Sequence, residues 1–130
     1  MKIYVLGNED MEMDRGAMEV VKKLKKINNI DFIFIKPNED LPAEDFLTLI
    51  DTVVGLTEVT LLTEKDLDKL IILGRVTAHD YDLGFQLKYL KKIGKLKKVR
   101  IIGLPAEGII DYERIQSILR KLVAQDMQGS

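Results

Sequence analysis

Short apolar runs that end at glycine, asparagine or proline recur along the chain and predict buried β-strands. The first run covers residues 3–6 and stops at Gly7-Asn8, and the second covers residues 31–35 and stops before Pro37. The third covers residues 47–50 and ends at Asp51. A later run over residues 97–105 predicts a further buried strand, terminated by glycine and proline.

Apolar positions at three- and four-residue spacing predict amphipathic helices between these strands. One helix is expected over residues 14–27, with lysines on its outer face. Another opens at His79-Asp80 and is closed by Gly94, and a third covers residues 111–123 with Asp111 as its N-cap. Because a strand, a helix and a strand follow one another at the start of the chain, we expect a right-handed parallel crossover there.

The remaining segments predict less regular structure. Residues 37–42 indicate a loop with one helical turn at 43–46, which leaves no room for a full helix before the third strand. Residues 57–62 indicate an antiparallel edge strand, whereas residues 64–73 fit a helix or a strand equally well. The expected fold is α/β, a three-layer sandwich in which helices cover both faces of a mostly parallel, twisted sheet of about five strands.

Composition narrows the function classes. A chain of 130 residues with 46% hydrophobic residues fits one domain, which we assign to residues 1–124 with a polar tail over 125–130. Lysine and arginine number 20 against 21 aspartates and glutamates, so no global charge favours nucleic acid or a membrane surface. Cysteine is absent, which excludes disulfides and thiolate chemistry. We expect a cytoplasmic protein, since no signal peptide or membrane-length apolar run occurs, and the oligomeric state is left open.

Three residues at strand ends and helix starts could carry chemistry, because ligands of open α/β sheets bind beyond the carboxyl ends of the strands. They are Asp14, Asp51 and His79. Two carboxylates and an imidazole suit a divalent ion such as nickel or zinc. Taken singly, each residue has a plainer interpretation as a helix cap or a turn residue. The lysine runs at 22–26 and 95–98 are interpreted as solvated surface.

Four motifs in order resemble the hydrogenase maturation endopeptidases, which trim a C-terminal extension from the nickel-bearing large subunit of nickel–iron hydrogenases. The motifs are Val5-Leu6-Gly7-Asn8 with Asp14 and Gly16, Leu49-Ile50-Asp51-Thr52-Val53, Thr77-Ala78-His79-Asp80-Tyr81-Asp82-Leu83, and Ile101-Ile102-Gly103-Leu104-Pro105-Ala106-Glu107. Two features depart from the family. Met13 and Arg15 flank Asp14 where the family has a further acidic residue, and the glycine-rich segment after the second strand is replaced by residues 36–40.

The resemblance implies an endopeptidase that cuts a hydrogenase large-subunit precursor. It implies that Asp14, Asp51 and His79 contact nickel already loaded in that precursor, with zinc or another divalent ion as a substitute, and that these residues form the catalytic site. A non-proteolytic metal-binding or chaperone-like relative is the alternative, because the surroundings of Asp14 are altered. A plain nucleotide-binding domain is a weaker third hypothesis, since Gly7-Asn8 does not complete a phosphate-binding glycine motif.

Overall fold

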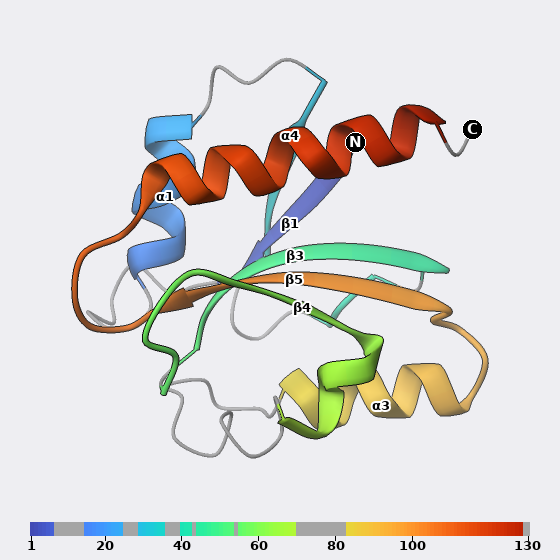
Figure 1. Cartoon of the computed structure of the whole chain (residues 1–130). Coiled ribbons are helices and arrows are strands. Elements are labelled where there is room, and N and C mark those ends of the chain that lie inside the picture. The colour runs from blue at the N-terminus through green and yellow to red at the C-terminus, as the bar shows by residue number, and fades with distance from the viewer. Residues whose placement is uncertain are drawn as a thin grey trace.

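A computed structural model describes residues 1–6, 15–24, 29–35, 40–42, 44–53, 55–69 and 83–128 (Figure 1). Strands and helices alternate at the two ends of the chain, whereas β2, β3 and β4 follow one another in the described order of elements. The elements are β1 (Lys2–Leu6), α1 (Arg15–Leu24), β2 (Asp31–Ile35), β3 (Phe46–Val53), β4 (Thr60–Thr63), the short 3-10 helix η1 (Glu64–Asp66), α3 (Leu83–Lys92), β5 (Lys98–Pro105) and α4 (Tyr112–Gln128). Within the described residues, no helix is long and apolar enough to span a bilayer.

The five strands form one sheet in the order β2-β1-β3-β5-β4. The strands β2, β1, β3 and β5 are parallel, and only the edge strand β4 is antiparallel, pairing with β5. The chain moves from β1 outward to β2 and then returns to the other side of β1 with β3. The direction of winding therefore reverses between β1 and β3, which is the position where open α/β sheets bind their ligands.

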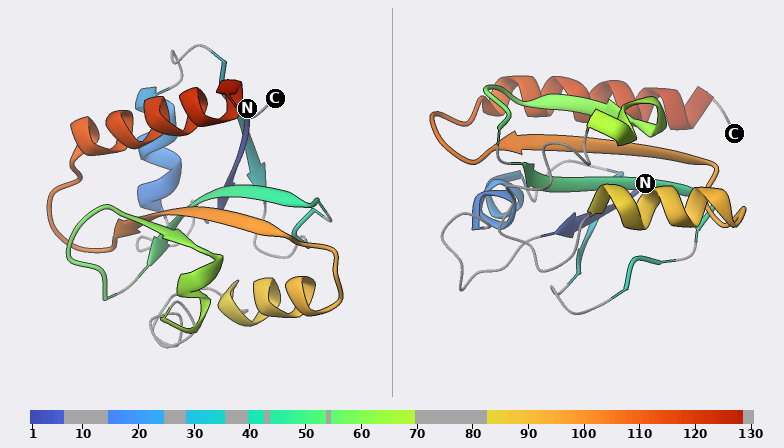
Figure 2. Two further views of the ribbon diagram at one scale, coloured as in Figure 1. Left: turned by 45° about the vertical axis from the view of Figure 1, so that its right-hand side comes forward. Right: turned by 90° about the horizontal axis from the view of Figure 1, so that it is seen from below.

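Helices cover both faces of the sheet (Figure 2), so the predicted three-layer α/β sandwich is confirmed. On one face, α1 and α4 bury an apolar cluster that includes Val20, Ile50 and Leu119. On the other face, α3 contributes Leu87 to a second cluster with Leu49. Side chains alternate between the faces along each strand, and successive residues such as Leu49 and Ile50 therefore belong to different clusters.

The helix and strand predictions hold for most elements, with corrections at β3. The helical turn expected at residues 43–46 is wrong for its described residues, because Phe46 is the first residue of β3 and pairs with Lys98. The strand also continues beyond Asp51 to Val53, since β5 pairs with β3 along its whole length. At the C-terminus, α4 extends through Gln128 into the segment that was set apart as a polar tail.

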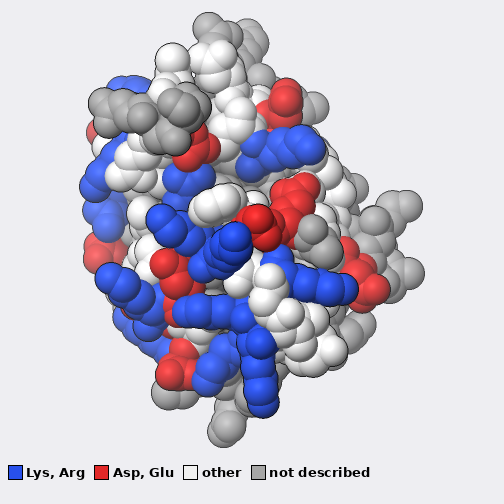
Figure 3. All heavy atoms as spheres, turned by 90° about the vertical axis from the view of Figure 1, so that its right-hand side faces the viewer, with Lys and Arg blue, Asp and Glu red and all other residues white. Residues whose placement is uncertain are grey.

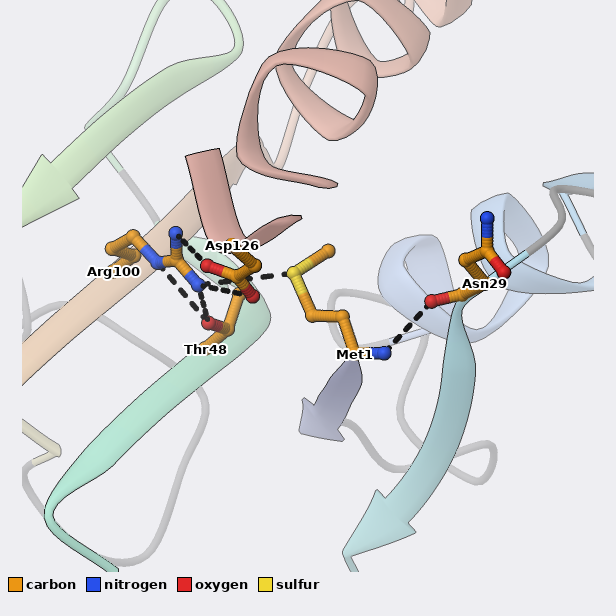
Figure 4. A network of polar contacts seen from close by, with 5 residues as sticks. All are labelled: Met1, Asn29, Thr48, Arg100 and Asp126. Atoms are coloured by element: carbon orange, nitrogen blue, oxygen red, sulfur yellow. Dashed lines mark hydrogen bonds and ion pairs between the residues drawn. The ribbon is translucent and has the colours of Figure 1, made fainter. Parts of the chain in front are cut away.

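At the amino ends of the parallel strands, a polar network joins three elements (Figure 4). The Arg100 guanidinium on β5 donates to Thr48 Oγ1 on β3 at 2.9 Å and forms an ion pair with Asp126 on α4 at 3.1 Å. The same group lies 3.7 Å from the Met1 sulfur, and the Met1 amino group donates to the Asn29 carbonyl at 2.8 Å. The network fastens the end of α4 to the start of the central strands.

Candidate functional site

Asp51 lies in the carboxyl-terminal half of β3, beside the point where the winding of the sheet reverses. Val5 of β1 is opposite Ile50, so Asp51 is level with Leu6, the last residue of β1. On its other side, Asp51 is paired with Gly103 of β5. The residue is thus held by two hydrogen-bonded strands at the edge where a ligand of this fold is expected.

The Asp51 side chain is 2% exposed. Alternation along β3 directs it to the same face as Leu49, the face that α3 covers. An isolated carboxylate in such surroundings would be costly, because burial removes the water that stabilises its charge. Asp51 is not isolated, since it has an interaction partner. A buried, engaged carboxylate near the carboxyl end of a central strand is a candidate site residue rather than a solvated turn residue.

Gly103 provides space next to Asp51. A Cβ atom at this position would lie 2.6 Å from Leu56 Cδ1 and 3.5 Å from the Thr60 carbonyl oxygen. Leu56 follows the turn after β3 and packs against the core on the Asp51 face. The strand predicted over residues 97–105 is confirmed, since β5 runs through Gly103 to Pro105. The role of Gly103 is to let the Leu56 side chain approach the strand next to Asp51.

Thr52 follows Asp51 and directs its side chain to the opposite face of the sheet, where α1 packs. The residue is 3% exposed, and in the described part of the chain its Oγ1 atom has no hydrogen-bond partner. A buried hydroxyl without a partner is rare in folded proteins and calls for an explanation. Thr52 is not among the site residues predicted from the sequence, although its position directly after Asp51 could have indicated it.

The other two predicted site residues, Asp14 and His79, lie outside the described residues. The helices that follow them are described, and in Figure 1 the first turns of α1 and α3 lie toward the side where β3 and β5 end. No group of three or more histidine, aspartate or glutamate side chains within the described ranges could hold a metal ion. Of the three predicted site residues, Asp51 is therefore the one that the structure describes.

A cavity of about 740 Å³ lies at the other end of the sheet and is not part of this site. Phe46, Leu47, Lys98 and Arg100 line it, at the amino ends of β3 and β5. Since Asp51 lies five residues beyond Phe46 on an extended strand, the two are separated by about 16 Å along the strand. This cavity and the candidate chemistry thus lie at opposite ends of the sheet, and the winding reversal favours the Asp51 end.

No protein-family model matches the chain, and no curated protein sequence does. Solved structures do resemble it. The hydrogenase maturating endopeptidase HybD from E. coli matches with a TM-score of 0.62 and 16% identity, covering 100% of this chain and 94% of that one. The solution structure of an endopeptidase from Escherichia coli matches with a TM-score of 0.58 and 17% identity, over 100% of this chain and 94% of the other.

A third structure, an uncharacterized protein from Wolinella succinogenes, matches with a TM-score of 0.52 and 14% identity over 99% of this chain and 98% of that one. All three similarities extend over nearly the whole of both chains. The fold is therefore the one that the sequence motifs imply. At these identities the similarity establishes architecture, and this chain has the fold of the hydrogenase maturating endopeptidase HybD.

Proposed function

We propose that this protein is an endopeptidase of hydrogenase maturation, which removes the C-terminal extension of a nickel-loaded hydrogenase large-subunit precursor. The observation that carries the proposal is the buried Asp51 carboxylate beside the winding reversal of a sheet whose fold is that of HybD. The order of the four sequence motifs supports the same assignment.

In this proposal the nickel ion belongs to the substrate. Asp51, together with Asp14 and His79, contacts that ion, and zinc or another divalent ion can substitute for it. Oxygen and nitrogen donors of this kind suit such ions. Asp51 is well suited to the role, since a strand held on both sides positions a ligand more accurately than a loop does.

Peptide hydrolysis requires a polarised scissile carbonyl and a group that accepts a proton from the attacking water. A divalent ion carried by the substrate provides the polarisation, as bound metal ions do in metal-assisted hydrolysis. A carboxylate within hydrogen-bond reach of the water accepts the proton. The protein then positions the substrate and supplies negative charge at the carboxyl end of the sheet. Either Asp14 or Asp51 can serve as the base.

Incubation with a nickel-loaded large-subunit precursor tests the proposal, with the precursor mass as readout. The unmodified protein should shorten the precursor at its C-terminus, and a nickel-free precursor should stay intact. Asp51→Asn should lower the cleavage rate by about 100-fold or more, the loss expected when a proton-transfer group is removed. His79→Ala should abolish cleavage, because it removes an imidazole donor that contacts the ion.

Asp68→Asn is the matched control, because Asp68 is an exposed carboxylate that pairs with Lys88 at the surface. Its cleavage rate should equal that of the unmodified protein, and thermal unfolding should verify that every variant is folded. Full activity of His79→Ala would contradict the assignment. Stable binding of the precursor without any change of mass would instead support a non-proteolytic, chaperone-like relative.

A further inference from the structure

Positive charge is concentrated in one short stretch of the chain. Residues 88–98 contain six lysines and no acidic residue, although the whole chain has a formal net charge of −1. This stretch covers the end of α3, the following turn and the start of β5. Figure 3 looks onto this end of the molecule and shows Lys and Arg gathered over its lower part, where α3 lies in Figure 1.

The backbone that carries these lysines is held in place. Gly94, with φ of 80°, lets the chain reverse after α3, and the amides of Lys95 and Leu96 donate to the Leu90 carbonyl at 3.0 and 3.2 Å. Leu96 is buried and fixes the turn to the core. The amides of residues 97 and 98 then donate to the Asp45 carbonyl at 2.8 and 3.0 Å. The lysines therefore project from a rigid platform.

Large apolar side chains lie among the lysines. Tyr89, Lys92 and Ile93 are spaced at i, i+3 and i+4 and share one outer side of the helix end, with Tyr89 62% and Ile93 45% exposed. On the adjacent strand, Phe46 is 62% exposed and is paired in register with Lys98. We call this region the lysine surface and define it by Phe46, Tyr89, Lys92, Ile93, Lys95 and Lys98.

The cavity of about 740 Å³ continues the lysine surface, since Phe46 and Lys98 belong to both. Two carboxylates also line the cavity, but each is engaged within the protein. Glu64 accepts a hydrogen bond from the Val99 amide at 3.3 Å, and Asp126 is paired with Arg100 at 3.1 Å. The cavity thus offers an apolar wall beside Lys98, which forms no ion pair with a carboxylate of the described residues.

Helix stability explains only part of this arrangement. The lysines in the last turn of α3 lie where the helix dipole favours cations, but Lys95 and Lys98 come after the helix has ended. Lys97 is paired with Asp45 at 3.8 Å. No carboxylate of the described residues pairs with Lys92, Lys95 or Lys98. Lys95 and Lys98 thus have no such role in the helix, and unpaired cations set among exposed apolar side chains are typical of a binding surface.

We propose that the lysine surface docks an acidic segment with apolar side chains on the protein substrate. This inference rests on the proposed endopeptidase function and adds a second contact, about 16 Å along β3 from Asp51. Charge complementarity supports an acidic partner, and Phe46 and Ile93 favour one that also presents apolar side chains. Phe46 and Tyr89 could also stack on bases. A protein is favoured because the proposed function itself supplies a protein substrate, and an oligonucleotide is included in the test.

Steady-state cleavage of the nickel-loaded precursor by the charge-reversed double variant Lys95→Glu/Lys98→Glu tests this docking. The expected result is an increase in KM of about 10-fold at low salt, with the effect falling on KM rather than on kcat, because distant charges govern encounter and retention. The KM of the unmodified protein should rise with salt concentration, and that of the variant should rise much less. Phe46→Ser should raise KM about equally at low and high salt.

Lys23→Glu/Lys121→Glu is the matched control, since both lysines are exposed and lie on α1 and α4, which cover the opposite face of the sheet from α3. Its KM should change less than two-fold. An unchanged KM for Lys95→Glu/Lys98→Glu, in a preparation whose parent cuts normally, would overturn the docking proposal alone. No cleavage by the parent protein would overturn the proposed function and the docking with it. Tight binding of a single-stranded oligonucleotide at 0.15 M salt, lost in the double variant, would assign the surface to nucleic acid instead.

Discussion

Asp51 is an unfavourable residue for a central strand, because aspartate is depleted in strands and its charge is costly to bury. The sheet nevertheless holds it between β1 and β5 with only 2% of its surface exposed. Residues that break a local rule in an otherwise consistent sheet are expected mainly at functional positions. The position of Asp51 therefore supports the proposed site more strongly than its residue type alone does.

Tyr4 gives a prediction at the same scale that does not depend on function. Its hydroxyl donates to Glu44 Oε1 at 2.6 Å, and burial, followed by this hydrogen bond, raises the pKa of Tyr4 from 10.0 to about 12. The folded state therefore holds the proton more tightly than the unfolded state. The resulting stability is fully present below pH 10 and is lost as the pH rises from about 10 to about 12.

Tyr4→Phe should lower the free energy of unfolding at pH 8 by about 1 kcal/mol and should flatten the decline of stability above pH 10. Urea unfolding at pH 8, 10 and 11 measures both effects. Tyr89→Phe serves as the control. Because Tyr89 is 62% exposed, this substitution should change neither the stability at pH 8 nor its pH dependence. Equal pH dependence in Tyr4→Phe and the unmodified protein would contradict the assigned cause.

At the scale of elements, Asp111 caps the start of α4. The Asp111 carboxylate accepts a hydrogen bond from the Arg114 amide at 3.0 Å, which satisfies one of the free donors at the start of the helix. Asp111→Ala should lower the free energy of unfolding by about 1 kcal/mol. Asp111→Asn retains the side-chain acceptor, so its free energy of unfolding should fall much less. Chemical unfolding followed by circular dichroism compares the two variants.

The elements also show how far the sequence predicts this structure. The N-terminal strands and the capped α4 were predictable, because buried apolar runs and an Asp before an apolar stripe are local signals. The true length of β3 was not, since its last three residues are held in strand conformation by pairing with β5, a contact distant in sequence. The strand conformation of Phe46 was not predicted for the same reason. That Asp14, Asp51 and His79 lie together in one site stays a prediction.

At the scale of the whole molecule, one sheet joins two apolar clusters. Leu49 belongs to the cluster under α3 and Leu119 to the cluster under α4, and both are fully buried. Because every central strand contributes to both clusters, we expect them to unfold together. Leu49→Ala and Leu119→Ala should each lower the free energy of unfolding by about 2–5 kcal/mol, in one cooperative transition.

Far-UV circular dichroism and the near-UV signal of the tyrosines should give coincident unfolding curves for both variants. Exposed positions provide the comparison, and Ile109→Ala, at a side chain that is 95% exposed, should change the midpoint little. Separate transitions for the two signals in either variant would show that the faces of the sheet unfold independently.

The lysine surface is a local excess of positive charge on a chain whose net charge is −1. A charged partner would therefore exert a torque on the protein during its approach and turn the lysines toward itself before any contact forms. The balanced overall charge argues only against a global attraction to a charged partner. A preferred orientation of encounter is still expected, and the association rate should fall as salt is added.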